Sequence, residues 1–259
     1  MSIASTGGWR ERGCPIAFGG HPIARGLRIC ELVHPGRVGY DEAIEKMELR
    51  ARARREQLVE DALILLEHEP VVTLGRAARE SNLLVAREQL ERQGVAVRES
   101  GRGGDVTYHG PGQLVGYPVI ELEPPRRDAH RYLRDLERVL ILALSDVGIR
   151  AQRRPGLTGV WFGPAKIASI GVRLSRWVTS HGFALNVGGN LGGFRAIVPC
   201  GIAGCEMTSL ERLLGRPVGL DEISGPVARR FGEVFGRRMV AAGARAEVDP
   251  RSFERGSAP

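Results

Sequence analysis

Hydrophobic and polar positions along the chain follow two different periods, which together predict a mixture of helices and strands. Over residues 128–147 the apolar side chains recur every three or four positions, as on one helix face, at Leu133, Leu136, Leu140 and Ala143. A second helix is predicted over residues 40–59, with Asp41 as its N-cap. Further helices are expected at residues 85–93 and 220–242.

Short apolar or alternating runs bounded by turn residues are typical of strands. They occur at residues 62–67, 71–74, 95–99, 106–109, 113–122, 159–162, 166–174 and 178–187. Because helices and strands do not alternate regularly, we expect an α/β (α+β) fold with a mixed sheet, rather than a barrel or a doubly wound sheet. We predict a single domain over residues 26–242, preceded by a loosely ordered arm (1–25) and followed by a tail (243–259).

The composition narrows the class of protein. The chain has 259 residues, 42% of them hydrophobic, which is enough to bury a sizeable core. No apolar run approaches the roughly 20 residues of a membrane-spanning helix, and residues 1–12 lack the apolar stretch of a secretory signal. We therefore expect a cytoplasmic protein without membrane contact. The four cysteines form neither a disulfide framework nor a zinc-binding pattern, so no structural metal is expected.

The net charge of +7 indicates acidic partners. Nucleic acid is one such partner, but the arginines are spread along the chain and only 5% of the residues are aromatic. A nucleic-acid-binding module would cluster its basic residues and use aromatic side chains for stacking, so we expect no nucleic-acid partner.

Lysine is rare in this arginine-rich chain. Of the 37 Lys and Arg residues, only Lys46 and Lys166 are lysines. Arginine keeps its proton near neutral pH, so a retained lysine is a candidate for proton transfer. Lys166 begins an alternating stretch, where its ammonium either reaches solvent or faces a pocket.

Glycines and polar side chains are most concentrated in the segment Arg102-Gly-Gly-Asp-Val-Thr-Tyr-His-Gly-Pro-Gly-Gln113. Its glycines would let backbone N–H groups approach a ligand, or would serve only a tight hairpin. It has neither the spacing of a P-loop nor that of a dinucleotide-binding turn. A second glycine follows a histidine in His181-Gly-Phe-Ala-Leu-Asn186, where Gly182 would admit an acyl chain or another backbone, or mark a bulge.

Cys200 lies in Val198-Pro-Cys-Gly-Ile202, a sequence that favours a sharp exposed turn. A lone cysteine is more often buried and inert, but a neighbouring cation would activate its thiol. Lys166, His109 and His181 are the candidate cations. Cys205 is the weaker nucleophile because Glu206, directly beside it, would raise the pKa of its thiol.

Four blocks occur together in one order: the segment 102–113, Lys166-Ile-Ala-Ser-Ile-Gly171, the segment 181–186 and Pro199-Cys-Gly201. With His68-Glu-Pro-Val-Val-Thr-Leu-Gly75, they resemble the lipoyl(octanoyl) transferase family over about residues 62–215. Glu69 is a mild departure, since the family often has two prolines after this histidine. The resemblance implies a mixed-sheet α/β fold shared with biotin and lipoate protein ligases, so residues 26–242 would be an octanoyltransferase catalytic domain.

The resemblance also implies an activity: transfer of an octanoyl group from acyl carrier protein to a lysine of lipoyl domains. The acceptors would be the lipoyl domains of 2-oxoacid dehydrogenases and the H protein of the glycine cleavage system. No cofactor is expected, because the acyl group arrives on the phosphopantetheine arm of the carrier. A monomer is expected.

By position, Cys200 matches the family's acyl-thioester nucleophile and Lys166 the residue that activates it. The matching substrate-binding residues are Arg102, Gly103, Gly104, Asp105, Val106, Thr107, Tyr108, His109, Ser169, Ile170, Gly171, Gly182, Phe183 and Ala184. Two alternatives remain at this point. An ATP-dependent lipoate or biotin ligase would share the fold without needing Cys200, and a papain-like protease would also use Cys and His, although its family motif is missing.

Overall fold

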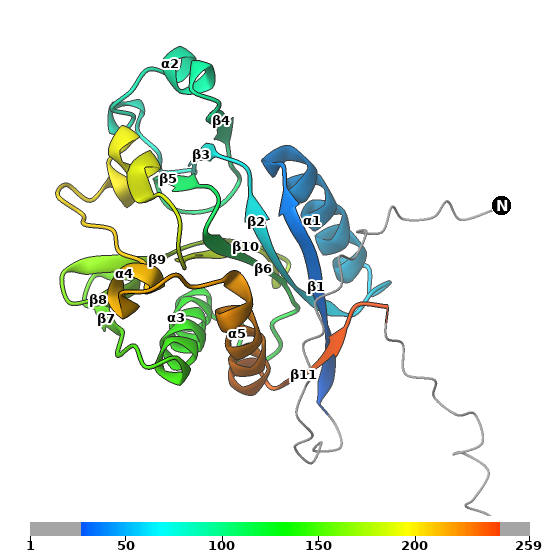
Figure 1. Ribbon diagram of the computed structural model, residues 1–259. Coiled ribbons are helices and arrows are strands. Elements are labelled where there is room, and N and C mark those ends of the chain that lie inside the picture. Colours follow the sequence, from blue (N-terminus) through cyan, green and yellow to red (C-terminus); the bar gives the residue numbers. More distant parts are fainter. Residues whose placement is uncertain (1–26, 244–259) are drawn as a thin grey trace, which may run out of the picture.

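The computed structural model describes residues 27–243 (Figure 1), so the predicted arm and nearly all of the predicted tail lie outside the described residues. Within this range, eight strands form one large sheet. In spatial order they are β11 (Arg237–Ala241), β1 (Arg28–Val38), β2 (Asp61–His68), β6 (Gln113–Val119), β10 (Val178–Asn186), β9 (Ala165–Ser175), β8 (Leu157–Phe162) and β7 (Gln152–Arg154). β1 runs parallel to β11 and β2, and the other neighbours are antiparallel. The expected mixed-sheet α/β fold is confirmed.

Three further strands form a small sheet above the large one, in the order β4 (Ala96–Glu99), β3 (Val71–Leu74) and β5 (Val106–His109). A tight turn at residues 110–112 returns the chain from β5 to β6. Gly112 has φ +90°, and a Cβ there would lie 2.5 Å from the carbonyl oxygen of Gly188. This turn therefore requires glycine for both its backbone conformation and its close contact.

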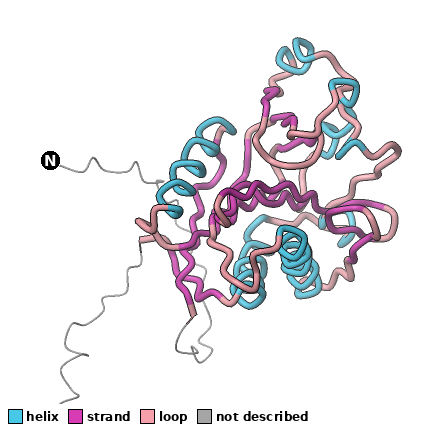
Figure 2. Tube along the Cα trace, turned by 180° about the vertical axis from the view of Figure 1, so that it is seen from behind, coloured by secondary structure: helices cyan, strands magenta, loops and turns pink. Residues whose placement is uncertain are grey.

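Two helices cover one face of the large sheet and one covers the other (Figures 1 and 2). α3 (Ala129–Asp146) and α5 (Leu220–Phe235) bury Leu136, Leu140 and Phe231 against the sheet. The carboxylate of Asp128 caps α3 by accepting the N–H groups of His130 and Arg131. α1 (Tyr40–Arg55) packs on the opposite face.

The shorter elements connect these layers. They are η1 (Glu80–Asn82), α2 (Arg87–Arg92), η2 (Leu191–Ala196), η3 (Pro199–Gly201) and α4 (Leu210–Leu214).

The predicted ends of two helices are wrong. Gly39, rather than Asp41, precedes the first turn of α1, and the helix ends at Arg55. The helix predicted to reach residue 242 ends at Phe235, because Gly236 adopts a left-handed conformation (φ +64°) that terminates it. The chain then forms β11 beside β1, a strand that the sequence analysis missed.

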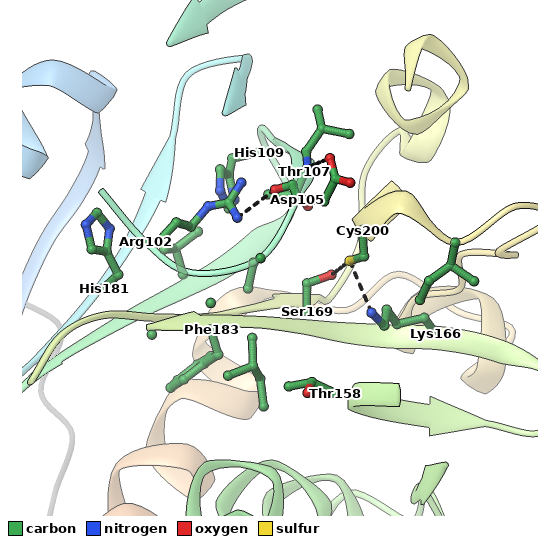
Figure 3. A pocket seen from close by; sticks show the side chains of 18 of the residues that line it. Arg102, Asp105, Thr107, His109, Thr158, Lys166, Ser169, His181, Phe183 and Cys200 are labelled. Carbon is green, nitrogen blue, oxygen red and sulfur yellow. Dashed lines mark hydrogen bonds between the residues drawn. The ribbon is translucent and has the colours of Figure 1, made fainter. Parts of the chain in front are cut away.

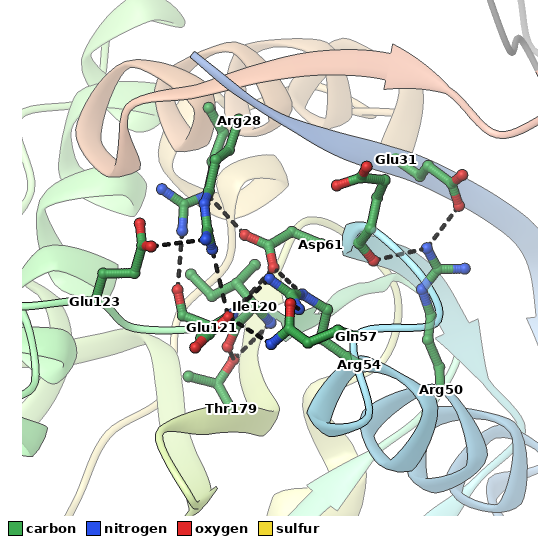
Figure 4. Close-up of polar contacts among 12 residues, drawn as sticks. Arg28, Glu31, Arg50, Arg54, Gln57, Asp61, Ile120, Glu121, Glu123 and Thr179 are labelled. Atoms are coloured by element: carbon green, nitrogen blue, oxygen red, sulfur yellow. Dashed lines mark hydrogen bonds and ion pairs between the residues drawn. The ribbon is translucent and has the colours of Figure 1, made fainter. Parts of the chain in front are cut away.

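A buried carboxylate joins the sheet edge to α1 (Figure 4). Asp61 accepts hydrogen bonds from Arg54 Nε (2.7 Å), Arg237 Nε (2.7 Å) and the N–H of Glu121 (3.0 Å). Asp61 is only 1% exposed, so these partners, rather than water, must compensate the cost of burying its negative charge. The contacts link β2 to α1, to β11 and to the end of β6.

None of the helices within residues 27–243 combines the length and apolar character needed to cross a membrane. The same residues contain no group of three or more His, Cys, Asp or Glu side chains placed to hold a metal ion.

Candidate active site

Lys166 and Cys200 meet although 34 positions separate them in the chain. Lys166 Nζ lies 3.1 Å from Cys200 Sγ, and Ser169 Oγ lies 3.7 Å from the same sulfur (Figure 3). Lys166 and Ser169 both belong to β9. The Lys166 backbone also bonds to the segment after Cys200: its N–H donates to Glu206 O (2.8 Å), and its carbonyl accepts from Thr208 N–H (3.0 Å). These two bonds hold the Cys200 turn and β9 in register.

The ammonium of Lys166 is buried without a carboxylate partner among residues 27–243. Lys166 is 1% exposed, and its Nζ lies 5.0 Å from the centre of the Trp161 ring. Burying an unpaired ammonium is costly, so the thiol sulfur and the ring are the groups that compensate it here. Of the three candidate cations, Lys166 is therefore the one that lies beside Cys200.

Cys200 occupies a strained turn. It has φ +57° and ψ +19° within η3, a left-handed conformation that non-glycine residues rarely adopt. Gly201 follows with φ +68°, and a Cβ on Gly201 would lie 2.5 Å from Asp105 Oδ2. Asn82 Nδ2 donates to that same carboxylate oxygen (2.7 Å). The turn is half-buried rather than fully exposed, because the loop around Asp105 packs directly against it.

Arg102 holds the glycine-rich loop in place. Its guanidinium donates to the carbonyls of Gly103, Asp105 and Thr73 and to the Thr73 hydroxyl, at 2.7–3.2 Å. Burial lowers the pKa of Arg102, yet these four acceptors satisfy most of its donors. The side chain therefore fastens the loop of residues 100–105 to β3.

A cavity of about 250 Å³ lies next to the Lys166–Cys200 pair. Every residue that the sequence analysis assigned to substrate binding lines it, except Gly103 and Tyr108. The N–H of Gly103 donates to Val172 O (2.9 Å), so it is not available to a ligand. The Tyr108 ring instead packs edge-on against Phe194, with ring centres 5.6 Å apart.

Three polar side chains of this cavity were not predicted from the sequence: Tyr40, Tyr117 and Thr158. Tyr117 had a usable signal, because alternation along β6 places it on the same face as Val115. Tyr40 is the first residue of α1 and gave no such signal. Gly182 lies where a second backbone passes, since a Cβ would clash with the carbonyl oxygen of Gly116.

The histidines near the cavity are neutral at physiological pH. Burial lowers the pKa of His68 to about 4 and that of His181 to about 3, and burial beside His68 and Arg102 holds the pKa of His109 well below its usual value. His68 Nε2 contacts the hydroxyl of Tyr117 (2.7 Å). His109 and His181 therefore do not supply the positive charge beside Cys200.

The other described cysteines are placed less favourably for chemistry. Burial raises the pKa of the Cys205 thiol, which is the expected direction, but the predicted cause is wrong, since Glu206 is not among the groups that shift it. Cys30 is fully buried in β1, where burial raises its pKa further. Cys14 lies outside the described residues.

Comparison with known proteins identifies the family. Residues 40–232 match the model of the lipoyl protein ligase A/B catalytic domain. The chain belongs to this family. The family model and its curated relatives confirm the resemblance drawn from the sequence, and the chain is a transferase of the lipoate ligase and octanoyltransferase family.

Curated relatives of this chain are named octanoyltransferase, including those of Solibacter usitatus and Myxococcus xanthus. The protein of Solibacter usitatus is 50% identical over 214 residues, which cover 83% of this chain and 96% of that protein. The protein of Myxococcus xanthus is 49% identical over 213 residues, which cover 80% of this chain. The match spans only 60% of that second relative's length.

Solved structures of lower sequence identity share the fold. A lipoate-protein ligase A bound with ATP superposes with a TM-score of 0.67, covering 83% of this chain and 89% of that chain at 15% identity. A putative lipoate protein ligase from T. acidophilum with bound lipoic acid gives a TM-score of 0.65 at 15% identity, covering 82% and 88%. At this identity the likeness concerns the fold alone.

Proposed function

We propose that the protein transfers an octanoyl group from acyl carrier protein to a lysine of lipoyl domains, through a thioester on Cys200. One observation carries the proposal: the buried Lys166 ammonium lies 3.1 Å from the Cys200 sulfur, beside a cavity large enough to hold part of an acyl chain. The octanoyltransferase names of the close relatives support the same reaction.

In the first half-reaction, the Cys200 sulfur attacks the carbonyl carbon of the donor thioester. The Lys166 ammonium stabilises the Cys200 thiolate beforehand. A new carbon–sulfur bond forms, the donor's carbon–sulfur bond breaks, and the departing thiolate takes a proton from Lys166. One thioester replaces another, so the step needs little net free energy.

In the second half-reaction, the amine of the acceptor lysine attacks the Cys200 thioester. The carbon–nitrogen bond forms, Cys200 leaves as a thiolate, and Lys166, now neutral, accepts the proton released by the amine. The product is an amide, which is more stable than a thioester, so no ATP is required. Arginine at position 166 would retain its proton and could not perform this transfer.

The acceptors we propose are lipoyl domains of 2-oxoacid dehydrogenases and the H protein of the glycine cleavage system. The net charge of +7 would attract acidic carrier and lipoyl domains and speed their encounter with this chain. We propose that the enzyme acts as a cytoplasmic monomer, without a cofactor of its own.

The decisive experiment is intact-mass spectrometry after incubation with octanoyl-acyl carrier protein in the absence of ATP. We expect the wild-type chain to gain the mass of one octanoyl group, the Cys200→Ser variant to gain none, and the Cys205→Ser control to gain the same mass as the wild type. Transfer to a lipoyl domain that requires ATP and survives Cys200→Ser would instead identify an adenylate-forming ligase.

A further inference from the structure

A second cavity, of about 610 Å³, meets the first one at the Cys200 turn. Ile202, two residues after Cys200, lines both cavities, and Pro199 lines the second. The opposite walls of the second cavity come from η2 and from α4. We call it the arginine groove, after Arg195 and Arg212, which line it.

These two arginines carry uncompensated positive charge. Both are exposed, and neither forms an ion pair with any residue in the range 27–243. Within the described part of the chain, the Arg212 guanidinium makes only a long contact to the Met207 carbonyl (3.4 Å). Nearby Arg216, by contrast, is paired with Glu222 at 2.8 Å. No acidic side chain is among the described residues that line the groove.

The rest of the groove is largely uncharged. Leu84, Phe194, Ile197 and Met207 supply apolar surface, and Asn190 supplies an amide. A fitting occupant would therefore be a slender, mostly uncharged chain that carries an anionic group. Phosphate suits the anionic part, because guanidinium groups bind phosphate with strong, charge-assisted hydrogen bonds.

A thioester donor has two parts on either side of the carbonyl carbon that Cys200 attacks. The acyl part belongs in the cavity beside Lys166, so the thiol arm must leave the reacting carbon in another direction. The arginine groove is the neighbouring space that begins at the same turn. We infer that it binds the thiol arm of the donor, and that Arg195 and Arg212 bind the phosphate carried by that arm. This inference rests on the proposed function.

The test compares two small donors that differ only in the phosphate, octanoyl-4′-phosphopantetheine and octanoyl-pantetheine. Single-turnover acylation of Cys200 is followed by intact mass. We expect the wild type to react about tenfold faster with the phosphorylated donor, the effect of one charge-assisted contact. The double variant Arg195→Gln/Arg212→Gln should react with both donors at the same rate. Arg138→Gln, which changes an exposed arginine on α3, should keep the wild-type preference.

Three results would overturn the inference: equal rates for the two donors in the wild type, a preference that survives in the double variant, or a defect confined to the transfer from acyl-enzyme to a lipoyl domain. The last result would assign the groove to the acceptor. Failure of the proposed function looks different, since Cys200 would then be acylated by neither donor.

Cys205 provides a readout that does not depend on catalysis, because its side chain lines the groove. In the Cys200→Ser variant, S-octyl-4′-phosphopantetheine, a thioether that cannot transfer its chain, should slow alkylation of Cys205 by iodoacetamide. The same compound without phosphate should protect about tenfold less well. Equal protection by both compounds, or no protection, would contradict phosphate binding in the groove.

Discussion

The side chain of Lys166 lies against the backbone of Gly159, where a Cβ atom would stand 2.9 Å from Cε and 3.4 Å from Nζ. Gly159 also has φ +125°, and its N–H donates to the buried carboxylate of Glu137 (3.1 Å). The ammonium can therefore lie beside Cys200 because Gly159, in the neighbouring strand β8, has no side chain.

We expect Gly159→Ala to slow acylation of Cys200 at least tenfold, because the new methyl group would lie 2.6 Å from the Ala168 carbonyl oxygen and 2.9 Å from Lys166 Cε, so that the β8–β9 contact or the lysine must shift. Strain at this backbone angle should also lower the free energy of unfolding by about 1–3 kcal/mol. The matched control is Gly163→Ala, which has φ +56° but nothing within 4 Å of its Cβ. Equal acylation rates for the two variants would show that Gly159 does not position Lys166.

Replacing Lys166 by arginine separates charge from proton transfer. Lys166→Arg retains the cation but not a group that can lose its proton, so octanoyl transfer to a lipoyl-domain lysine should fall about 100-fold or more. Lys46→Arg is the control, since Lys46 is ion-paired with Glu42 on the exposed side of α1. Product formation is measured by the mass of the lipoyl domain. A wild-type rate for Lys166→Arg would exclude the proton-transfer role.

Stability should decline as the pH falls from about 6.5 towards 4. His68 and His181 have pKa values of about 4 and 3 in the folded protein, below the ordinary histidine value. The unfolded chain therefore binds more protons in this range, and protonation favours unfolding. For His68 alone the loss approaches about 3 kcal/mol. Urea unfolding at several pH values checks this, and His68→Gln should show a shallower pH dependence; an unchanged slope would contradict the assignment.

Removing the charge of Asp61 should destabilise the fold strongly. Asp61→Asn leaves Arg54 and Arg237 without their buried partner, which should cost about 3–5 kcal/mol of unfolding free energy. Asp146→Asn is the comparison, because its partners Arg229 and Arg230 lie nearer the surface, and it should cost about 1 kcal/mol or less. Similar losses in the two variants would argue against the buried network as a stabilising element.

The elements best predicted from the sequence are those with local signals. The strands Val71–Leu74 and Val106–His109 have the expected bounds, since Pro70 and Gly110 mark their ends in the chain. β11 was not predicted because it depends on pairing with β1, about 200 positions away in the chain. β1 was not predicted because Pro35-Gly36 interrupts its apolar alternation.

In the candidate site, too, residues with a local sequence signal were predicted, and residues placed by tertiary packing were not. The rarity of lysine and the Pro-Cys-Gly turn singled out Lys166 and Cys200, and the structure brings the two side chains into contact. Tyr40 joins the cavity through packing between α1 and the large sheet, which no local pattern encodes. The contact of Gly159 with Lys166 is equally invisible in the sequence, because a pair of strands creates it.

The left-handed backbone of Cys200 has a consequence for how this protein can be stabilised. Glycine adopts such a conformation freely, so Cys200→Gly should raise the free energy of unfolding by about 1 kcal/mol. The same change removes the thiol on which the proposed reaction depends. Urea unfolding of Cys200→Gly and Cys200→Ser would separate release of strain from loss of the sulfur. A selection for stability alone would therefore favour glycine at this position, and with it the loss of the proposed reaction.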